Sequence, residues 1–148
     1  MTGIHDYMTR HHAHCDALFT QAETEAMAED WAGAKRDCTA FLTDIARHMD
    51  AEENVLFPLF EARTGITGGP THVMRTEHTR MKEIFDGLLD AIGSRDATAY
   101  RGHAAALKSI LNAHNMKEES VLYPMLDQIA GAERDSTLDR VKALMEEN

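Results

Sequence analysis

The segment HMDAEENVLFPL, residues 48–59, returns almost unchanged as HNMKEESVLYPM at residues 114–125. Both copies place a histidine, two glutamates, Val-Leu, an aromatic residue and a proline in the same order. The same offset of 66 positions, from 48 to 114, also pairs residues outside these segments: His12 with His78, Phe19 with Phe85, and Asp30 with Asp96. A whole structural unit is therefore used twice.

The apolar residues around both segments recur at steps of three and four, which predicts amphipathic helices. Asp30 and Asp96 each precede a long helical pattern and are expected N-caps, and the stretch TGITGGPT at 64–71 is the main expected loop. We expect helices near 4–28, 31–63, 71–92, 97–130 and 136–146. The predicted fold is all-α: one domain over residues 1–148, an antiparallel up-down four-helix bundle of two hairpins (about 4–63 and 71–130) with a short fifth C-terminal helix.

Pro58 and Pro124 lie inside two of these expected helices. A proline in a helix interior removes one backbone hydrogen bond, so each is expected to kink its helix. The alternative is that both helices end there. The apolar pattern continues to Phe60 and Leu126, which favours continuation.

The composition excludes several classes of partner. The chain has 148 residues, of which 43% are hydrophobic and 27% charged, and its formal net charge is −10. No basic cluster is present, which argues against nucleic acid. No apolar run approaches the ~20 residues of a membrane helix, and the N-terminal sequence lacks the apolar block of a signal peptide. We therefore expect a cytoplasmic protein with no membrane partner.

The histidine-bearing stripe of each hairpin helix coincides with its apolar stripe, so imidazoles and carboxylates are directed into the core. The offset and the helical phase select His12 over His11 and His14. A carboxylate buried without a partner is unfavourable by several kcal/mol and usually protonates. Because both halves repeat this feature, we infer metal ions between them, with the predicted ligands His12, His48, Glu52, His78, His114 and Glu118.

The spacing indicates how such ligands act together. His48 and Glu52 are four residues apart, as are His114 and Glu118, so each pair shares one helical face. Four imidazoles and two carboxylates are too many for one tetrahedral zinc. They suit two ions, each with two imidazoles, bridged by the carboxylates. This mixed donor set favours iron, with manganese or zinc as alternatives, and the zinc-protease motif HExxH is absent.

Other polar residues have simpler interpretations. The histidines could be core residues satisfied by hydrogen bonds, but the repeat favours ligation. Cys15 with His12 could form a nucleophile pair, although a small buried thiol is the simpler reading. Glu53 and Glu119 are rotated by about 100° from the ligand face. They could contact the ligands from a second layer, but solvated side chains are the favoured interpretation. The remaining candidates are interpreted as surface or second-layer residues (Glu77, Asp16, His72) or as packing residues on the far side of their helices (Tyr123, Phe57).

In its order of His12, His48-x3-Glu52, His78 and His114-x3-Glu118, the chain resembles the hemerythrin-like, or HHE cation-binding, family from about residue 8 to residue 126. The resemblance implies an oxo- or hydroxo-bridged di-iron site. His12 and His48 would hold one iron, His78 and His114 the other, and Glu52 and Glu118 would bridge. Oxygen-carrying members have a further histidine one turn before the third-helix ligand, where this chain has Met74; the mirrored position is Met8.

These features support three hypotheses. The first is a di-iron protein that binds O2 or a related small molecule for sensing, storage or redox chemistry. The second is a redox enzyme that handles NO or peroxide, because the missing imidazole leaves coordination open. The third is an iron-responsive regulatory module whose short fifth helix meets a protein partner; a homodimer also stays open. The expected apolar lining of the pocket is Val55, Leu56, Val121, Leu122, Phe19 and Phe85.

Overall fold

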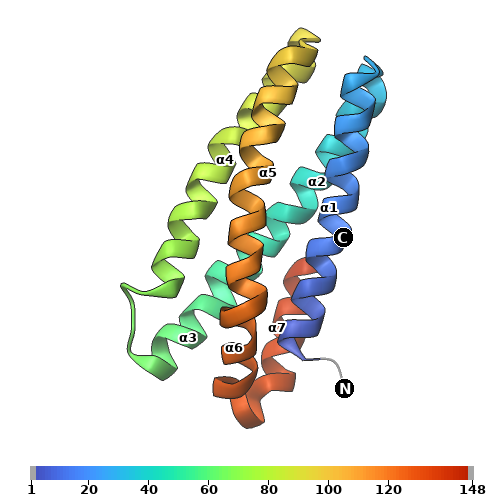
Figure 1. The fold of residues 1–148 in the computed structure, drawn as a ribbon. Helices are drawn as coiled ribbons and strands as arrows, with labels where there is room; N and C mark the ends of the chain where they lie inside the picture. Colours follow the sequence, from blue (N-terminus) through green and yellow to red (C-terminus); the bar gives the residue numbers. More distant parts are fainter. Residues whose placement is uncertain (1–2, 147–148) are drawn as a thin grey trace.

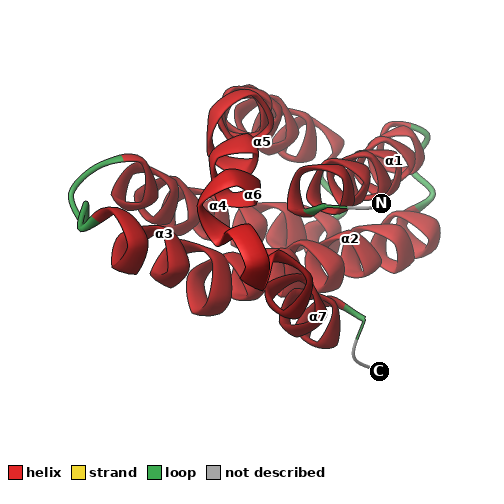
Figure 2. Cartoon of the chain, turned by 90° about the horizontal axis from the view of Figure 1, so that it is seen from below, coloured by secondary structure: helices red, strands yellow, loops and turns green. Residues whose placement is uncertain are grey.

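The computed structural model describes residues 3–146, which form helices joined by short loops, with no strand in that range (Figures 1 and 2). The first hairpin pairs α1 (Ile4–Met27) with α2 (Trp31–Ala51), and the second hairpin pairs α4 (Pro70–Ser94) with α5 (Ala97–Lys117). In order along the chain, the elements are α1 (Ile4–Met27), α2 (Trp31–Ala51), η1 (Glu52–Leu56), α3 (Phe57–Thr64), α4 (Pro70–Ser94), α5 (Ala97–Lys117), η2 (Glu118–Leu122), α6 (Tyr123–Ala130), η3 (Gly131–Glu133) and α7 (Arg134–Met145). This confirms the expected helical bundle.

Side chains and backbone conformation set the ends of these helices. The carboxylate of Asp30 accepts a hydrogen bond from the N–H of Gly33, and that of Asp96 from the N–H of Ala99, so both predicted N-caps are confirmed. Gly65 adopts a left-handed conformation with φ 73° and ends α3. The predicted loop is therefore correct, and only residues 65–69 separate α3 from α4.

A contact between the two halves fixes the start of α1. The carboxylate oxygens of Asp127 in α6 accept hydrogen bonds from the backbone N–H groups of Ile4, at 2.7 Å, and His5, at 3.0 Å. These N–H groups have no partner within α1, since the first turn of any helix leaves its donors free. Asp127 thereby joins α1 to the end of the second hairpin.

The two prolines follow π-helical turns and do not end their helices. The π-helical segments η1 and η2 immediately precede α3 and α6, and Pro58 and Pro124 are the second residues of those helices. Proline has no N–H for the carbonyl four residues back, and its ring clashes with that carbonyl. A wider turn relieves both problems, so each long helix continues, to Thr64 and to Ala130.

The buried apolar residues form two clusters separated along the bundle. One lies between α1, α2, α4 and α5 and contains Cys15, Ile45, Met81 and Leu111. The other lies toward α3, α6 and α7 and contains Met8, Val55, Met74 and Leu122. On every long helix the predicted ligands fall between a residue of the first cluster and a residue of the second. A buried polar layer therefore crosses the bundle between two apolar clusters.

The last helix, α7, packs against α2 and η1, as Figure 2 shows from below. Its buried residues, Leu138, Val141 and Met145, face the bundle. The apolar face of α7 is thus covered by its own chain, because this face completes the lower core. The other face of α7 is exposed, and the expectation that this helix meets a protein partner stays a prediction.

Candidate metal centre

The structure brings all six predicted ligand residues together in the buried polar layer. His12 comes from α1, His78 from α4, and the two His-x3-Glu pairs from the junctions of α2 with η1 and α5 with η2. No side chain of the six is more than 3% exposed. Their donor atoms form two groups, each within 4.8 Å, that share Glu118: one contains Glu52, His78, His114 and Glu118, and the other His12, His48 and Glu118.

Several of these atoms lack the partner that burial requires. Among the described residues, Nε2 of His78, Oε1 of Glu52 and Oε2 of Glu118 make no hydrogen bond of good geometry. Nε2 of His78 lies 3.1 Å from Oε1 of Glu52, and Oε2 of Glu118 lies 3.2 Å from Nε2 of His114. An unsatisfied buried polar group is unfavourable by about 1–3 kcal/mol, and three adjacent ones are unusual in a native core. Cations would satisfy all three, so the buried His/Glu cluster suggests a di-metal site.

The outer nitrogens of two of the histidines predicted as ligands contact glutamates of the opposite hairpin. Nδ1 of His12 lies 2.6 Å from Oε2 of Glu119, and Nδ1 of His78 lies 2.7 Å from Oε2 of Glu53. A histidine that donates its Nδ1–H to a carboxylate presents the lone pair of Nε2 inward, which is the usual arrangement of a metal ligand. The interpretation of Glu53 and Glu119 as solvated is therefore wrong, because their side chains reach across to the neighbouring helix.

The other two ligand histidines have different partners. Nδ1 of His114 lies 2.8 Å from Oε1 of Glu77, whereas Nδ1 of His48 lies 2.9 Å from Nδ1 of His11. Burial and the neighbouring histidines, His48 first, lower the pKa of His11 to about 3, so its ring is neutral and can accept the Nδ1–H of His48. Positions 11 and 77 are related by the offset of 66. The remaining second-layer candidates, Asp16 and His72, are exposed.

Tyr123 lies in the middle of the cluster. Its hydroxyl donates to Oε2 of Glu52 at 2.7 Å or to Oε1 of Glu118 at 2.9 Å. The same oxygen lies 3.0 Å from Nε2 of His48 and 3.2 Å from Nε2 of His12. The prediction that Tyr123 packs on the far side of its helix, away from the metals, is therefore wrong.

The π-helical turn explains this position. In η2 the N–H of Tyr123 bonds to the carbonyl of Glu118, five residues back, and in η1 the N–H of Phe57 bonds to Glu52 in the same way. Residues five apart stack in such a turn, so Tyr123 lies above Glu118. With the uniform α-helical period, a residue nine positions beyond His114 would face the opposite side.

Comparison with known sequences places the chain in a family. The profile of the Hemerythrin HHE cation binding domain matches residues 3–126, most of the chain. The chain belongs to the hemerythrin HHE cation-binding family. No curated protein and no solved structure gives a significant match. The family match ends before α7. One helical turn before His78 and one turn before His12 the chain has methionines, Met74 and Met8, and both are buried.

The buried His/Glu cluster, called the HHE cluster below, consists of the six residues predicted as ligands. Its electrostatics favour protonated imidazoles and ionised carboxylates. Burial alone would lower the pKa of His114, but Glu118, Glu52 and Glu77 outweigh it and raise this pKa to about 9. Burial alone would raise the pKa of Glu52, but His48 and other neighbours hold it well below 4.5. Without metal, the cluster therefore holds protons on imidazole that an incoming cation would displace.

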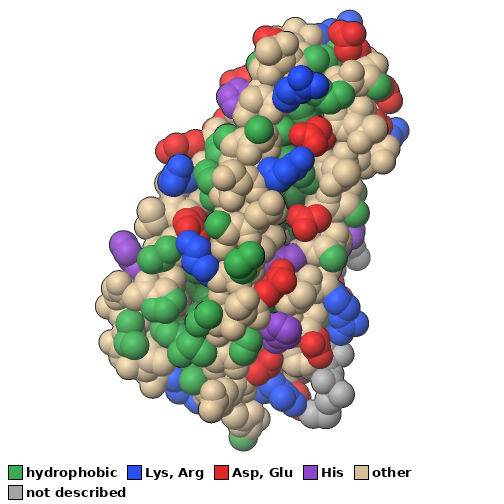
Figure 3. Space-filling model, in the orientation of Figure 1, with side chains coloured by type: hydrophobic (Ala, Val, Ile, Leu, Met, Phe, Trp, Pro, Cys, Tyr) green, Lys and Arg blue, Asp and Glu red, His purple; other side chains and the backbone are tan. Residues whose placement is uncertain are grey.

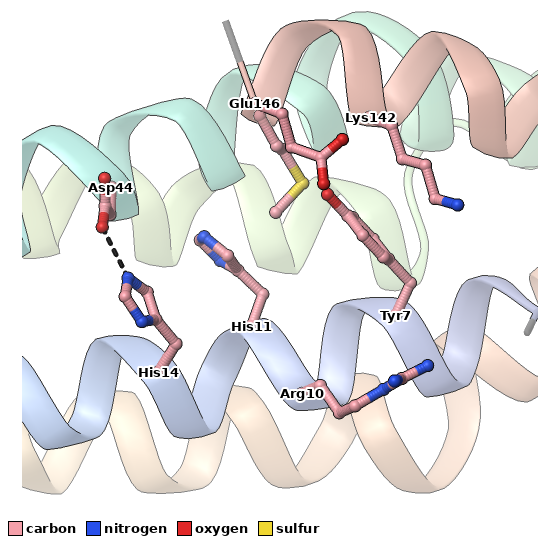
Figure 4. Close-up of a pocket in the computed structure, with 8 residues that line it drawn as sticks. Tyr7, Arg10, His11, His14, Asp44, Lys142 and Glu146 are labelled. Atoms are coloured by element: carbon pink, nitrogen blue, oxygen red, sulfur yellow. Dashed lines mark hydrogen bonds and ion pairs between the residues drawn. The ribbon is translucent and has the colours of Figure 1, made fainter. Parts of the chain in front are cut away.

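A polar pocket of about 530 Å³ is lined by Tyr7, His11, His14 and Asp44 (Figure 4), and His11 connects it to His48. His11 points into it from α1, and Nε2 of His14 lies 2.6 Å from Oδ2 of Asp44 at one side. Cys15 contacts His11 through its thiol, with Sγ 3.7 Å from Nδ1. Burial raises the pKa of Cys15 to about 12, so the thiol is not activated as a nucleophile.

An apolar pocket of about 180 Å³ opens beside the other half of the HHE cluster, near the start of α4. Hydrophobic side chains gather on this lower part of the surface in Figure 3. The lining includes Met74 and Leu122, which are buried, and Val121, which is 51% exposed. The expectation that Val121 lines the interior is wrong. Its counterpart Val55 is buried in η1, against which α7 packs, whereas Val121 in η2 is exposed. No helix in the described range is long and apolar enough to cross a membrane.

Proposed function

We propose that this protein is a non-haem di-iron protein that binds O2 or a related small molecule at the buried His/Glu cluster. His12 and His48 would hold one ion, His78 and His114 the other, and Glu52 and Glu118 would lie between them. The observation that carries the proposal is the set of buried, inward-facing donor atoms without partners beside Glu52 and Glu118. Mixed imidazole and carboxylate donors suit iron, with manganese or zinc as alternatives.

The bound iron pair would supply the electrons that a small oxidant such as O2 takes up. The protein's own residues orient the donors and keep bulk water out. Glu53, Glu77, Glu119 and His11 hold the imidazole rings through Nδ1. The apolar clusters on both sides would exclude water, and the apolar pocket beside Met74 would let an uncharged diatomic approach the cluster.

The direct test is metal analysis of protein purified without chelator, followed by anaerobic reduction and exposure to O2. We expect two iron ions per chain and a new visible absorption when O2 or azide is added. A Glu52→Ala variant is the control and should show neither. Two irons with no spectral response to O2 or azide would contradict small-molecule binding while leaving the di-metal site intact.

A second candidate function is turnover of NO or peroxide at the same centre. It is favoured by Met8 and Met74, buried thioethers at the positions where a further imidazole was considered, since fewer ligands leave more coordination open. Catalytic consumption of peroxide or NO by the iron-loaded protein would support this function. A stoichiometric adduct without turnover would favour simple binding.

A further inference from the structure

We propose that the phenol oxygen of Tyr123 is a ligand of the metal ion held by His12 and His48, and not of the other ion. This inference rests on the proposed di-metal site and concerns what distinguishes its two halves. The hydroxyl lies 3.0 Å from Nε2 of His48 and 3.2 Å from Nε2 of His12. Those are the two nitrogens of one ion, and the oxygen lies within hydrogen-bonding distance of both.

The pseudo-symmetry shows why the second ion differs. The offset of 66 relates Tyr123 to Phe57, and both follow a π-helical turn. The ring of Tyr123 lies 5.5 Å from the ring of His12, and the ring of Phe57 lies 5.7 Å from the ring of His78, with similar tilts of 34° and 29°. The two aromatic rings occupy matching places, but only one of them has an oxygen.

The surroundings of this oxygen are those of a ligand. Tyr123 is fully buried, and its hydroxyl also contacts one carboxylate oxygen of Glu52 and one of Glu118. Ferric iron is a hard cation that prefers oxygen donors carrying negative charge. On binding, the phenol O–H bond breaks, an oxygen–iron bond forms, and the proton leaves to water; no electron is transferred.

This ligand would leave the open coordination on the other ion. The His78 and His114 half has Phe57 in place of a phenol, and it lies next to the apolar pocket lined by Met74 and Leu122. The His12 and His48 half faces the polar pocket through His11. An uncharged small molecule would therefore bind at the ion of His78 and His114.

The test is visible absorption and resonance Raman spectroscopy of the ferric protein, together with iron content per chain. We expect two irons and a visible band in which the ring vibrations of a bound tyrosinate are enhanced. Tyr123→Phe should retain iron and lose these vibrations completely. Tyr7→Phe removes a phenol in the polar pocket and is the matched control, which should leave the spectrum unchanged.

The double variant Phe57→Tyr with Tyr123→Phe moves the phenol to the other half and should restore the tyrosinate vibrations. If Tyr123→Phe folds poorly, the spectrum of the wild-type protein still decides the inference. Wild-type protein with two irons and no tyrosinate vibrations would overturn the inference and leave the proposed function standing. Wild-type protein without iron would overturn both, so the two failures are distinguishable.

Discussion

Single residues decide how the donor atoms of the centre are presented. Three of the four ligand histidines direct Nδ1 at a glutamate, and the fourth, His48, directs it at the neutral His11. A carboxylate at Nδ1 makes the imidazole a stronger donor than a neutral partner does. His48 is therefore the weakest-supported ligand of the set, and it belongs to the same half as Tyr123.

The glutamates at Nδ1 should tune affinity without being required for binding. Glu52→Ala and Glu118→Ala should lose most of the metal, because each removes an inward donor. We expect Glu53→Ala to retain metal with an affinity lower by about 10–100-fold, since His78 loses the group that orients it. Metal titration of each variant measures this, with the exposed Glu83→Ala as control. Unchanged affinity in Glu53→Ala would contradict a role for the His78 contact.

Because His114 holds a proton in the metal-free fold, we expect folding stability and metal affinity to depend on pH. Its pKa is raised from 6.5 to about 9 in the metal-free fold. The stability that this proton contributes is therefore fully present below pH 6.5 and is lost as the pH rises through about 9. Metal binding must release the proton, so metal affinity should rise over the same window. Calorimetric titration at pH 7 in two buffers with different ionisation heats should show release of at least one proton per chain; none released would contradict the prediction.

The six residues predicted as ligands could be selected together from the sequence because the repeat makes each position support its partner, and the structure brings them into one buried layer. Their partners at Nδ1 could not be predicted in the same way, because two of the contacts join different hairpins, two join the helices of one hairpin, and all depend on side-chain reach. The repeat nevertheless contains the signal: Glu53 pairs with Glu119, and position 11 pairs with Glu77. A duplicated glutamate beside a ligand position is better interpreted as a partner of the opposite half.

At the scale of elements, the two π-helical turns determine what faces the centre. A regular α-helical period assigns Tyr123 to the far side, yet the turn stacks it on Glu118. The helix boundaries, the caps and the continuation past both prolines follow from local rules that a sequence shows directly. The wider turn depends on tertiary packing, so side chains beyond it could not be placed from the apolar period.

The outward face of η2 gives a prediction about access. Val121 is half exposed at the rim of the apolar pocket, so Val121→Trp should fill that pocket without entering the core. We expect slower association of O2 or azide with the iron-loaded protein and unchanged iron content. Met116→Trp, at a 67% exposed position outside the pocket lining, is the control. Equal association rates in both variants, measured by stopped-flow absorption, would exclude this route.

At the scale of the whole molecule, a charged layer lies between two apolar clusters and draws donors from all four long helices. Metal should therefore stabilise the entire bundle. A ligand at ~100 times its dissociation constant stabilises the folded state by about 2.7 kcal/mol, or roughly 5–10 °C in Tm for a chain of this size. Calorimetric scans with and without chelator measure the shift. Glu52→Ala should show no shift, and an equal Tm for metal-loaded and metal-free wild type would contradict the prediction.

The offset of 66 has one more consequence. Two separate copies of a single hairpin could associate about a true twofold axis, but every change in one copy would then appear in the other. Covalent fusion removes that constraint, so Tyr123 could diverge from Phe57, and His11 from Glu77, while the ligands stayed matched. Joining the halves in one polypeptide is thus what permits two metal positions of unequal chemistry.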